Sequence, residues 1–167
     1  VDVGALLSGA AEMEALCRAR SLRENPAGLF ATLLHVAHVE RGQSIHVLMP
    51  YSDRLRTFAL WLRQLWAESL GKAHDREGRL IETGPTPLAA VGAVDQHSIL
   101  QLLMEGPRDK VVCLFRVRER EHPMDIPRLH SELSVLARLG GHTLEALLEN
   151  ERRATAEALR EVGRPSL

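Results

Sequence analysis

Two short apolar segments alternate with longer helical patterns, and this alternation constrains the fold more than any other feature. Residues 44–49 and 110–117 are rich in apolar and β-branched side chains, which is typical of strands buried on both faces. Residues 53–70 and 143–162 instead repeat apolar side chains with a helical period. Because strands separated by helices form parallel sheets covered by helices, we predict an α/β fold with a parallel sheet flanked by helices.

Capping residues and breakers predict the remaining elements. Asn25 followed by Pro26 indicates the start of a helix, and Asp95 indicates another. Residues 72–87 are polar and contain glycine and proline, so we predict a loop there. The other expected elements are helices over residues 3–22, 26–42, 95–105 and 130–139, and a short strand or turn over residues 88–92.

The helical patterns at the start of the chain precede the first strand. We therefore predict a helical arm over residues 1–43 and an α/β domain over residues 44–167. In the 167 residues, 45% are apolar and 26% are charged, as in soluble globular proteins. Cys17 and Cys113 are too few for a disulfide framework and indicate a reducing compartment, which we expect to be the cytoplasm.

Charge and hydropathy exclude two classes of partner. Lys and Arg total 21 and Asp and Glu total 22, so no basic excess is present to neutralise a phosphate backbone. We therefore expect no nucleic-acid partner. No apolar run approaches the roughly 20 residues that span a bilayer, so we expect no membrane partner either.

One stripe of the helix predicted over residues 53–70 carries polar side chains that packing does not require. Gln64 and Glu68 are four residues apart and are neighbours on the helix surface, with Thr57 on the same stripe. Glu68 lies in the last turn, where the helix dipole disfavours a negative charge, and such a carboxylate is suited to accept a proton. The alternative is an exposed glutamate that pairs with Lys72, and the spacing alone leaves both interpretations open.

A second candidate is His97, in the first turn of the helix that begins at Asp95. Free backbone N–H groups at such a position attract an anion or a sugar oxygen. The alternative is a capping cluster that contains an incidental histidine. The sequence has no dinucleotide-binding fingerprint, no phosphate-binding glycine loop and no zinc-binding histidine motif, so we expect no cofactor and no metal.

Several blocks of sequence, taken in order, resemble one known family. The blocks are Met49–Asp53, Gln64–Lys72, Gly84–Pro87 and Gly92–Ser98. Their order closely resembles glucose-6-phosphate isomerases of the bacterial type, also called phosphoglucose isomerases, and the resemblance covers nearly the whole chain. It implies two sugar isomerase (SIS) domains in the full enzyme. This chain is similar to the second of them, so we expect a fragment of a larger two-domain enzyme.

The resemblance also implies a reaction and roles for particular residues. The implied reaction interconverts glucose 6-phosphate and fructose 6-phosphate through a cis-enediolate, in glycolysis and gluconeogenesis. Glu68 is implied as the catalytic base, His97 as the group that helps to open the sugar ring, and Gln64 as a substrate ligand beside them. The implied partners are a phosphosugar substrate, the first SIS domain and a second copy in a homodimer.

Three elements of the family have no match in these residues. They are a Ser/Thr-rich phosphate loop, a Gly-Gly-Arg segment expected before Val1, and a lysine expected after Leu167. We therefore expect the chain to supply the base-bearing half of the site and to be inactive by itself. The alternative function is a non-catalytic SIS-type module that binds a phosphosugar. Glu68 and His97 together favour the enzyme, because a binding module has no use for a catalytic base.

Overall fold

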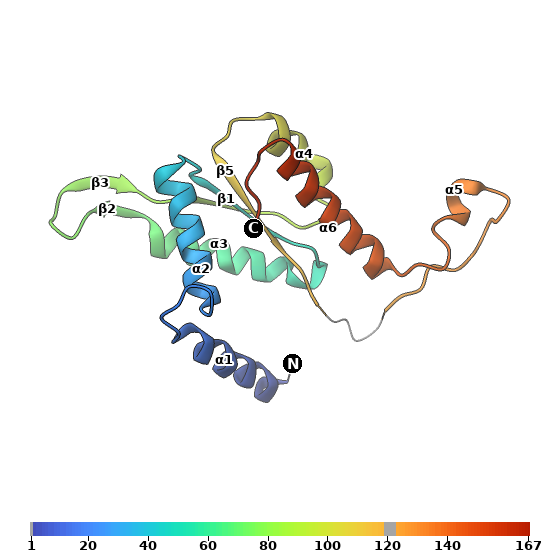
Figure 1. Ribbon diagram of the computed structural model, residues 1–167, viewed down its shortest axis with the longest axis horizontal. Coiled ribbons are helices and arrows are strands. Elements are labelled where there is room, and N and C mark those ends of the chain that lie inside the picture. Colours follow the sequence, from blue (N-terminus) through green and yellow to red (C-terminus); the bar gives the residue numbers. More distant parts are fainter. Residues whose placement is uncertain (1, 119–122) are drawn as a thin grey trace. The chain divides into compact units, whose positions relative to one another are not determined.

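The computed structural model describes residues 2–118 and 123–167. The chain divides into two compact units, one ending at Gly42 and the other spanning Gln43–Leu167. The first unit is helical (Figure 1). It contains α1 (Val3–Cys17), α2 (Pro26–His35) and a π-helical segment (Val36–Glu40). The assignment of the two ranges as an arm and an SIS-type domain stays a prediction.

The helix predicted over residues 3–22 is wrong at its C-terminal end, because α1 stops at Cys17. The Asn25 side chain accounts for this. Its Nδ2 donates to the carbonyl oxygens of Cys17 (2.8 Å) and Ala19 (3.0 Å), which partners these carbonyls at the end of the helix. Its Oδ1 accepts from the Gly28 amide at 2.8 Å and caps α2, whose predicted start is confirmed.

The second unit is built on a three-stranded parallel sheet in the order β4–β1–β5. The central strand β1 (Ile45–Pro50) pairs with β4 (Thr86–Ala89) on one side and with β5 (Lys110–Phe115) on the other. The residues at 165–167 continue the sheet beside β5, where the Val112 amide donates to the Pro165 carbonyl oxygen at 3.1 Å. Both predicted strands and the parallel sheet are confirmed.

Two helices, α4 (Gln96–Glu105) and α6 (Leu144–Glu161), cover one face of this sheet and pack against each other (Figure 1). Val47 of β1 joins Leu103 of α4 and Leu159 of α6 in one core cluster. Val47 and Leu159 are completely buried. The amphipathic helix predicted for the C-terminal part of the chain is thereby confirmed.

The helix α3 (Arg56–Leu70), which follows a short 3₁₀ turn (Asp53–Leu55), packs against β1 and β4 on the opposite face. Trp66 fixes α3 to the central strand, because its Nε1 donates to Nδ1 of the buried His46 at 3.1 Å. His46 precedes Val47 in β1, and consecutive side chains of a strand point to opposite faces. The sheet is therefore flanked by helices on both faces, as predicted.

The loop predicted over residues 72–87 is wrong, because most of this segment forms strands. β2 (Lys72–His74) and β3 (Leu80–Thr83) form an antiparallel hairpin, and β4 follows. Asp75 organises the turn, since its Oδ1 accepts from the Arg79 amide at 2.9 Å. This hydrogen bond holds the pKa of the Asp75 carboxyl below its ordinary value.

Two other helices differ from the sequence-based expectation. Asp95 precedes α4 as predicted, but its carboxylate accepts from the Val91 amide at 2.7 Å instead of capping the helix. The helix predicted over residues 130–139 is only α5 (Ser134–Ala137). None of the residues of α5 is buried, so packing does not extend it.

The structure also shows the state of the two cysteines and the apolar character of the helices. Cys17 and Cys113 are both free thiols. Burial in β5 raises the pKa of Cys113 to about 12, so this thiol stays protonated at neutral pH. None of the helices in the described residues has the length and apolar character that crossing a membrane requires.

The core beneath α6 leads to a stability prediction. We expect Leu159→Ala to lower the free energy of unfolding by about 2–5 kcal/mol, because it leaves a cavity in a completely buried cluster. Leu144→Ala is the matched control on the same helix; Leu144 is 46% exposed, so its loss should change stability by no more than roughly 0.5 kcal/mol. Equal midpoints for the two variants in denaturant unfolding of the purified chain would contradict the packing of α6.

Candidate active site

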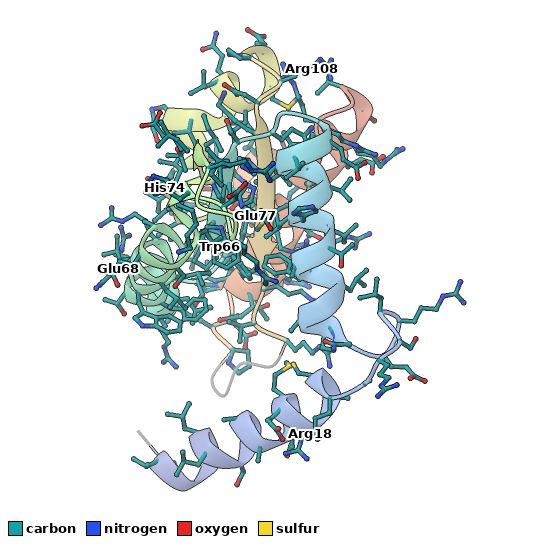
Figure 2. All side chains as sticks on the ribbon, turned by 90° about the vertical axis from the view of Figure 1, so that its left-hand side faces the viewer. Arg18, Trp66, Glu68, His74, Glu77 and Arg108 are labelled. Atoms are coloured by element: carbon teal, nitrogen blue, oxygen red, sulfur yellow. The ribbon has the colours of Figure 1, made fainter. Side chains whose placement is uncertain are left out.

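Gln64 and Glu68 lie on the outer side of α3, away from the sheet. Trp66 lies between them in sequence and contacts His46 of β1, so it faces the strands. At about 100° per residue, the residues two positions before and after it point to the other side of the helix. Figure 2 shows Trp66 next to the strands and Glu68 on the outer side of α3. One helix therefore packs with one side and presents polar groups with the other.

The two polar side chains form a hydrogen-bonded pair. Gln64 Nε2 donates to Glu68 Oε1 at 3.1 Å, and both side chains are exposed. Lys72 Nζ donates instead to the Ser69 carbonyl oxygen at 2.7 Å, so the alternative of a Glu68–Lys72 ion pair is wrong. Within the described residues, the Glu68 carboxylate has an amide partner and no cationic partner. A carboxylate in this state is able to accept a proton from a bound molecule.

An open groove of about 770 Å³ runs along this side of α3. Its walls come from α3 and β4 and are formed by Thr57, Leu60, Trp61, Arg63, Gln64, Ala67, Glu68 and Pro87. The groove combines apolar surface with one carboxylate, one amide and one guanidinium group. Such a surface suits a sugar, which offers hydroxyl groups to the polar side chains and C–H groups to the apolar ones.

Arg63 and Pro87 border the groove although the sequence did not place them on the stripe of Gln64 and Glu68. Arg63 belongs to a separate charged stripe by helical spacing, and its long side chain nevertheless borders the groove. Pro87 comes from β4, and its place depends on the pairing of Val47 with Leu88 in the parallel register. Nothing in a single sequence gives that register, so only the arginine, as a neighbour of Gln64, could have been considered beforehand.

His97 lies elsewhere. It is exposed in the first turn of α4, and it does not line the groove. Helix α4 packs on the face of the sheet opposite α3, and its first turn follows the carboxyl end of β4. Glu68 lies near the end of α3, which returns toward the amino ends of the parallel strands. The structure therefore brings Gln64 and Glu68 together and leaves His97 apart from them, and the joint role of the three residues stays a prediction.

A second cavity, of about 280 Å³, lies next to the end of β5 and the start of α6. Its charged lining residues are Arg116, Arg118, Glu145 and Glu149. Arg116 lies 3.6 Å from Glu149, and a hydrogen bond from Arg152 holds the pKa of the Glu149 carboxyl below its ordinary value. Because its arginines and glutamates balance, this cavity offers little net charge to an anion. Among the described residues, no three His, Cys, Asp or Glu side chains are grouped to hold a metal ion.

Comparison with known sequences identifies relatives of the chain. Residues 2–144 match the family described as phosphoglucose isomerase. The chain is 42% identical to the glucose-6-phosphate isomerase of Carboxydothermus hydrogenoformans and 44% identical to that of Rubrobacter xylanophilus. Each match covers 99% of this chain and 36% of the relative. The chain thus spans about a third of the length of these curated relatives.

Two solved structures also match the chain. A hypothetical protein from Thermus thermophilus matches with a TM-score of 0.88 and 38% identity, over 99% of this chain and 38% of that one. A glucose-6-phosphate isomerase from Chlamydia trachomatis matches with a TM-score of 0.77 and 28% identity, over 92% of this chain and 28% of that one. From the fold, the matched residues and these identities, the chain belongs to the phosphoglucose isomerase family.

Proposed function

We propose that this chain carries the proton-transferring part of a glucose-6-phosphate isomerase, which interconverts glucose 6-phosphate and fructose 6-phosphate. The observation that carries the proposal is the Gln64–Glu68 pair on the exposed side of α3. Its carboxylate is oriented by an amide and has no cationic partner within the described residues. Membership of the family supports the reaction class. In metabolism, this interconversion serves both glycolysis and gluconeogenesis.

In the proposed mechanism, Glu68 acts on the open-chain sugar. It takes the proton from C2 of the aldose, the electron pair of that C–H bond forms the C1–C2 double bond, and the aldehyde oxygen becomes the oxyanion of a cis-enediolate. The hydroxyl proton then moves from O2 to O1. Glu68 returns its proton to C1, and the C2 carbonyl of the ketose forms. Because C1 and C2 are adjacent, one carboxylate serves both transfers.

Gln64 holds this base in place. Its Nε2 donates to one carboxylate oxygen, which fixes the side-chain rotamer of Glu68. The carbonyl oxygen of the same amide is then available to a sugar hydroxyl group. Trp66 and its hydrogen bond to His46 fix the rotation of the helix underneath. The base therefore rests on a packed element, as accurate proton transfer requires.

In this proposal, the rest of a longer protein and a second copy of it complete the site. The rest of a longer protein, including a first SIS domain, supplies the phosphate-binding groups, and the chain covers only 36% of its curated relatives. His97 lies on the face of the sheet opposite Glu68. We therefore assign the two residues of one site to different copies in a homodimer, with Glu68 from one copy and His97 from the other. A reducing, cytoplasmic location fits the two free thiols.

Removal of the base tests the proposal directly. In the full-length protein that carries this chain, Glu68→Gln should lower kcat for glucose 6-phosphate by about 10²–10⁴-fold, because the isosteric amide cannot accept the C2 proton. KM should change little. The matched control is Glu105→Gln, since Glu105 also follows a glutamine by four residues at the end of a helix, with Gln101 Nε2 at 3.5 Å. Unchanged turnover in Glu68→Gln, with sugar binding retained, would instead favour a non-catalytic phosphosugar-binding module.

Mixed dimers test the assignment of residues to different copies. Glu68→Gln and His97→Ala should each be impaired alone. Co-expressed, half of the dimers should be mixed, and each of these should contain one site with both native residues, which restores about a quarter of the wild-type activity. That fraction applies to the unseparated mixture; dimers isolated through two different affinity tags, one on each variant, are all mixed and should recover about half of the wild-type activity. Mixed dimers as inactive as the parents would show that both residues act within one copy.

The 167-residue chain alone should turn over glucose 6-phosphate at least about 100-fold more slowly than the full-length protein. Binding of the remote phosphate normally orients the sugar at its reacting carbons, and the proposed phosphate-binding groups lie outside these residues. A coupled assay measures the rate, with circular dichroism as the control for folding. Normal turnover by the isolated chain would refute the proposed division of the site.

A further inference from the structure

Polar side chains from three separate elements meet at the first turn of α4. Gln96 Nε2 donates to the Tyr51 hydroxyl group and also to Thr155 Oγ1, the latter at 2.6 Å. The Thr155 hydroxyl in turn donates to the Glu151 carbonyl oxygen at 2.9 Å within α6. Tyr51 is 2% exposed and Thr155 is 5% exposed, so both acceptors are sheltered from water, and Gln96 is half-buried. We call these three side chains, Tyr51, Gln96 and Thr155, the polar clamp.

The polar clamp holds one residue in one orientation. A glutamine amide nitrogen has two hydrogens, and in Gln96 each has a separate acceptor on a different element. Tyr51 directly follows β1, and Thr155 lies in the buried side of α6. The Gln96 side chain is therefore fixed from two directions. A half-buried polar group with two buried partners specifies one geometry, whereas apolar contacts at the same place would allow the helix to shift.

Tyr51 also supports the turn that leads into α4. A Cβ atom at Gly92 would lie 2.5 Å from the Tyr51 ring, so this backbone lies directly against the ring. The Gly92 amide donates to the Pro50 carbonyl oxygen at 3.0 Å, and Asp95 accepts from Val91 within the same turn. The segment that precedes His97 is thus seated on the residue at the end of the central strand.

His97 itself is exposed and follows Gln96 directly. We propose that the polar clamp positions His97 for ring opening, by fixing the height and rotation of the first turn of α4. This inference rests on the role that the proposed function gives to His97. Packing alone does not require the polar clamp, because Leu103, two turns further along α4, is already buried in the core. The clamped residue instead adjoins the one side chain of α4 with a proposed chemical role.

Two substitutions of Thr155 separate positioning from stability. In the full-length protein, Thr155→Val keeps the shape of the side chain and removes the hydroxyl group, whereas Thr155→Ser keeps the hydroxyl group and removes a methyl group. We expect Thr155→Val to lower kcat for closed-ring glucose 6-phosphate by about tenfold or more, with KM nearly unchanged. Thr155→Ser should retain kcat even if its Tm falls. The reverse order of kcat values would overturn the inference.

Substitution of Gln96 tests the same positioning role, with Gln101 on the same helix as the matched control. Gln96→Ala should lower kcat, and Gln101→Ala, which removes an exposed glutamine from the same helix, should not. Inhibition by a straight-chain sugar-acid phosphate, which needs no ring opening, should be similar in both variants. Equal kcat values for the two variants, or a matching loss of inhibitor binding in Gln96→Ala, would overturn the role in ring opening.

A double-mutant cycle connects the polar clamp to His97. If the polar clamp acts through His97, Thr155→Val should cause no further loss of kcat in a His97→Ala background. A loss of the same size in both backgrounds would overturn the positioning role alone. An unchanged kcat in the single variant His97→Ala would overturn the proposed role of His97 and this inference together. Glu68→Gln reports on the proposed base independently, so the two failures are distinguishable.

Discussion

The central strand β1 is hydrogen-bonded along both of its edges, to β4 and to β5, and it is buried on both faces. Val47, Leu48 and Met49 are completely buried, and burial of three such side chains contributes roughly 5–9 kcal/mol. Because consecutive residues face opposite layers, this one strand fixes α4 and α6 on one side and α3 on the other. Tyr51 directly follows this strand. Both proposed chemical groups, Glu68 and His97, are therefore located relative to the same few residues of backbone.

The parts of the fold that the sequence predicts are those with strong burial. Segments 45–50 and 110–115 are largely buried, so apolar side chains run continuously from Val47 and from Val111 and indicate strands. The β2–β3 hairpin could not be predicted in this way, because its strand residues are exposed and carry no apolar pattern. The end of α1 was missed for another reason. It depends on the Asn25 side chain, which reaches back to Cys17, and helical periodicity contains no information about such a contact.

In the candidate site, too, a contact between residues close in sequence could be predicted, whereas contacts between distant residues could not. The Gln64–Glu68 pair follows from a spacing of four residues on one helix, so its hydrogen bond could be anticipated. The contact of Gln96 with Thr155 joins residues 59 positions apart, and it depends on how α4 and α6 pack over the sheet. The separation of His97 from Glu68 also arises from topology. The resemblance in sequence motifs implies that Glu68 and His97 act together. The order of strands and helices determines on which face of the sheet each of them lies.

Helix α3 packs on the sheet with one side and presents Gln64 and Glu68 on the other. This arrangement restricts where residues can be inserted in sequences of this kind. One residue inserted between Trp66 and Glu68 would turn the carboxylate about 100° around the helix while the tryptophan stayed on His46. The turn of the β2–β3 hairpin, which begins only a few residues later, is exposed and closed by the local contacts of Asp75. Exposed turns of this type accept insertions without disturbing a core. Evolution can therefore lengthen the chain freely at the hairpin, whereas the helix beside it must keep its residue count.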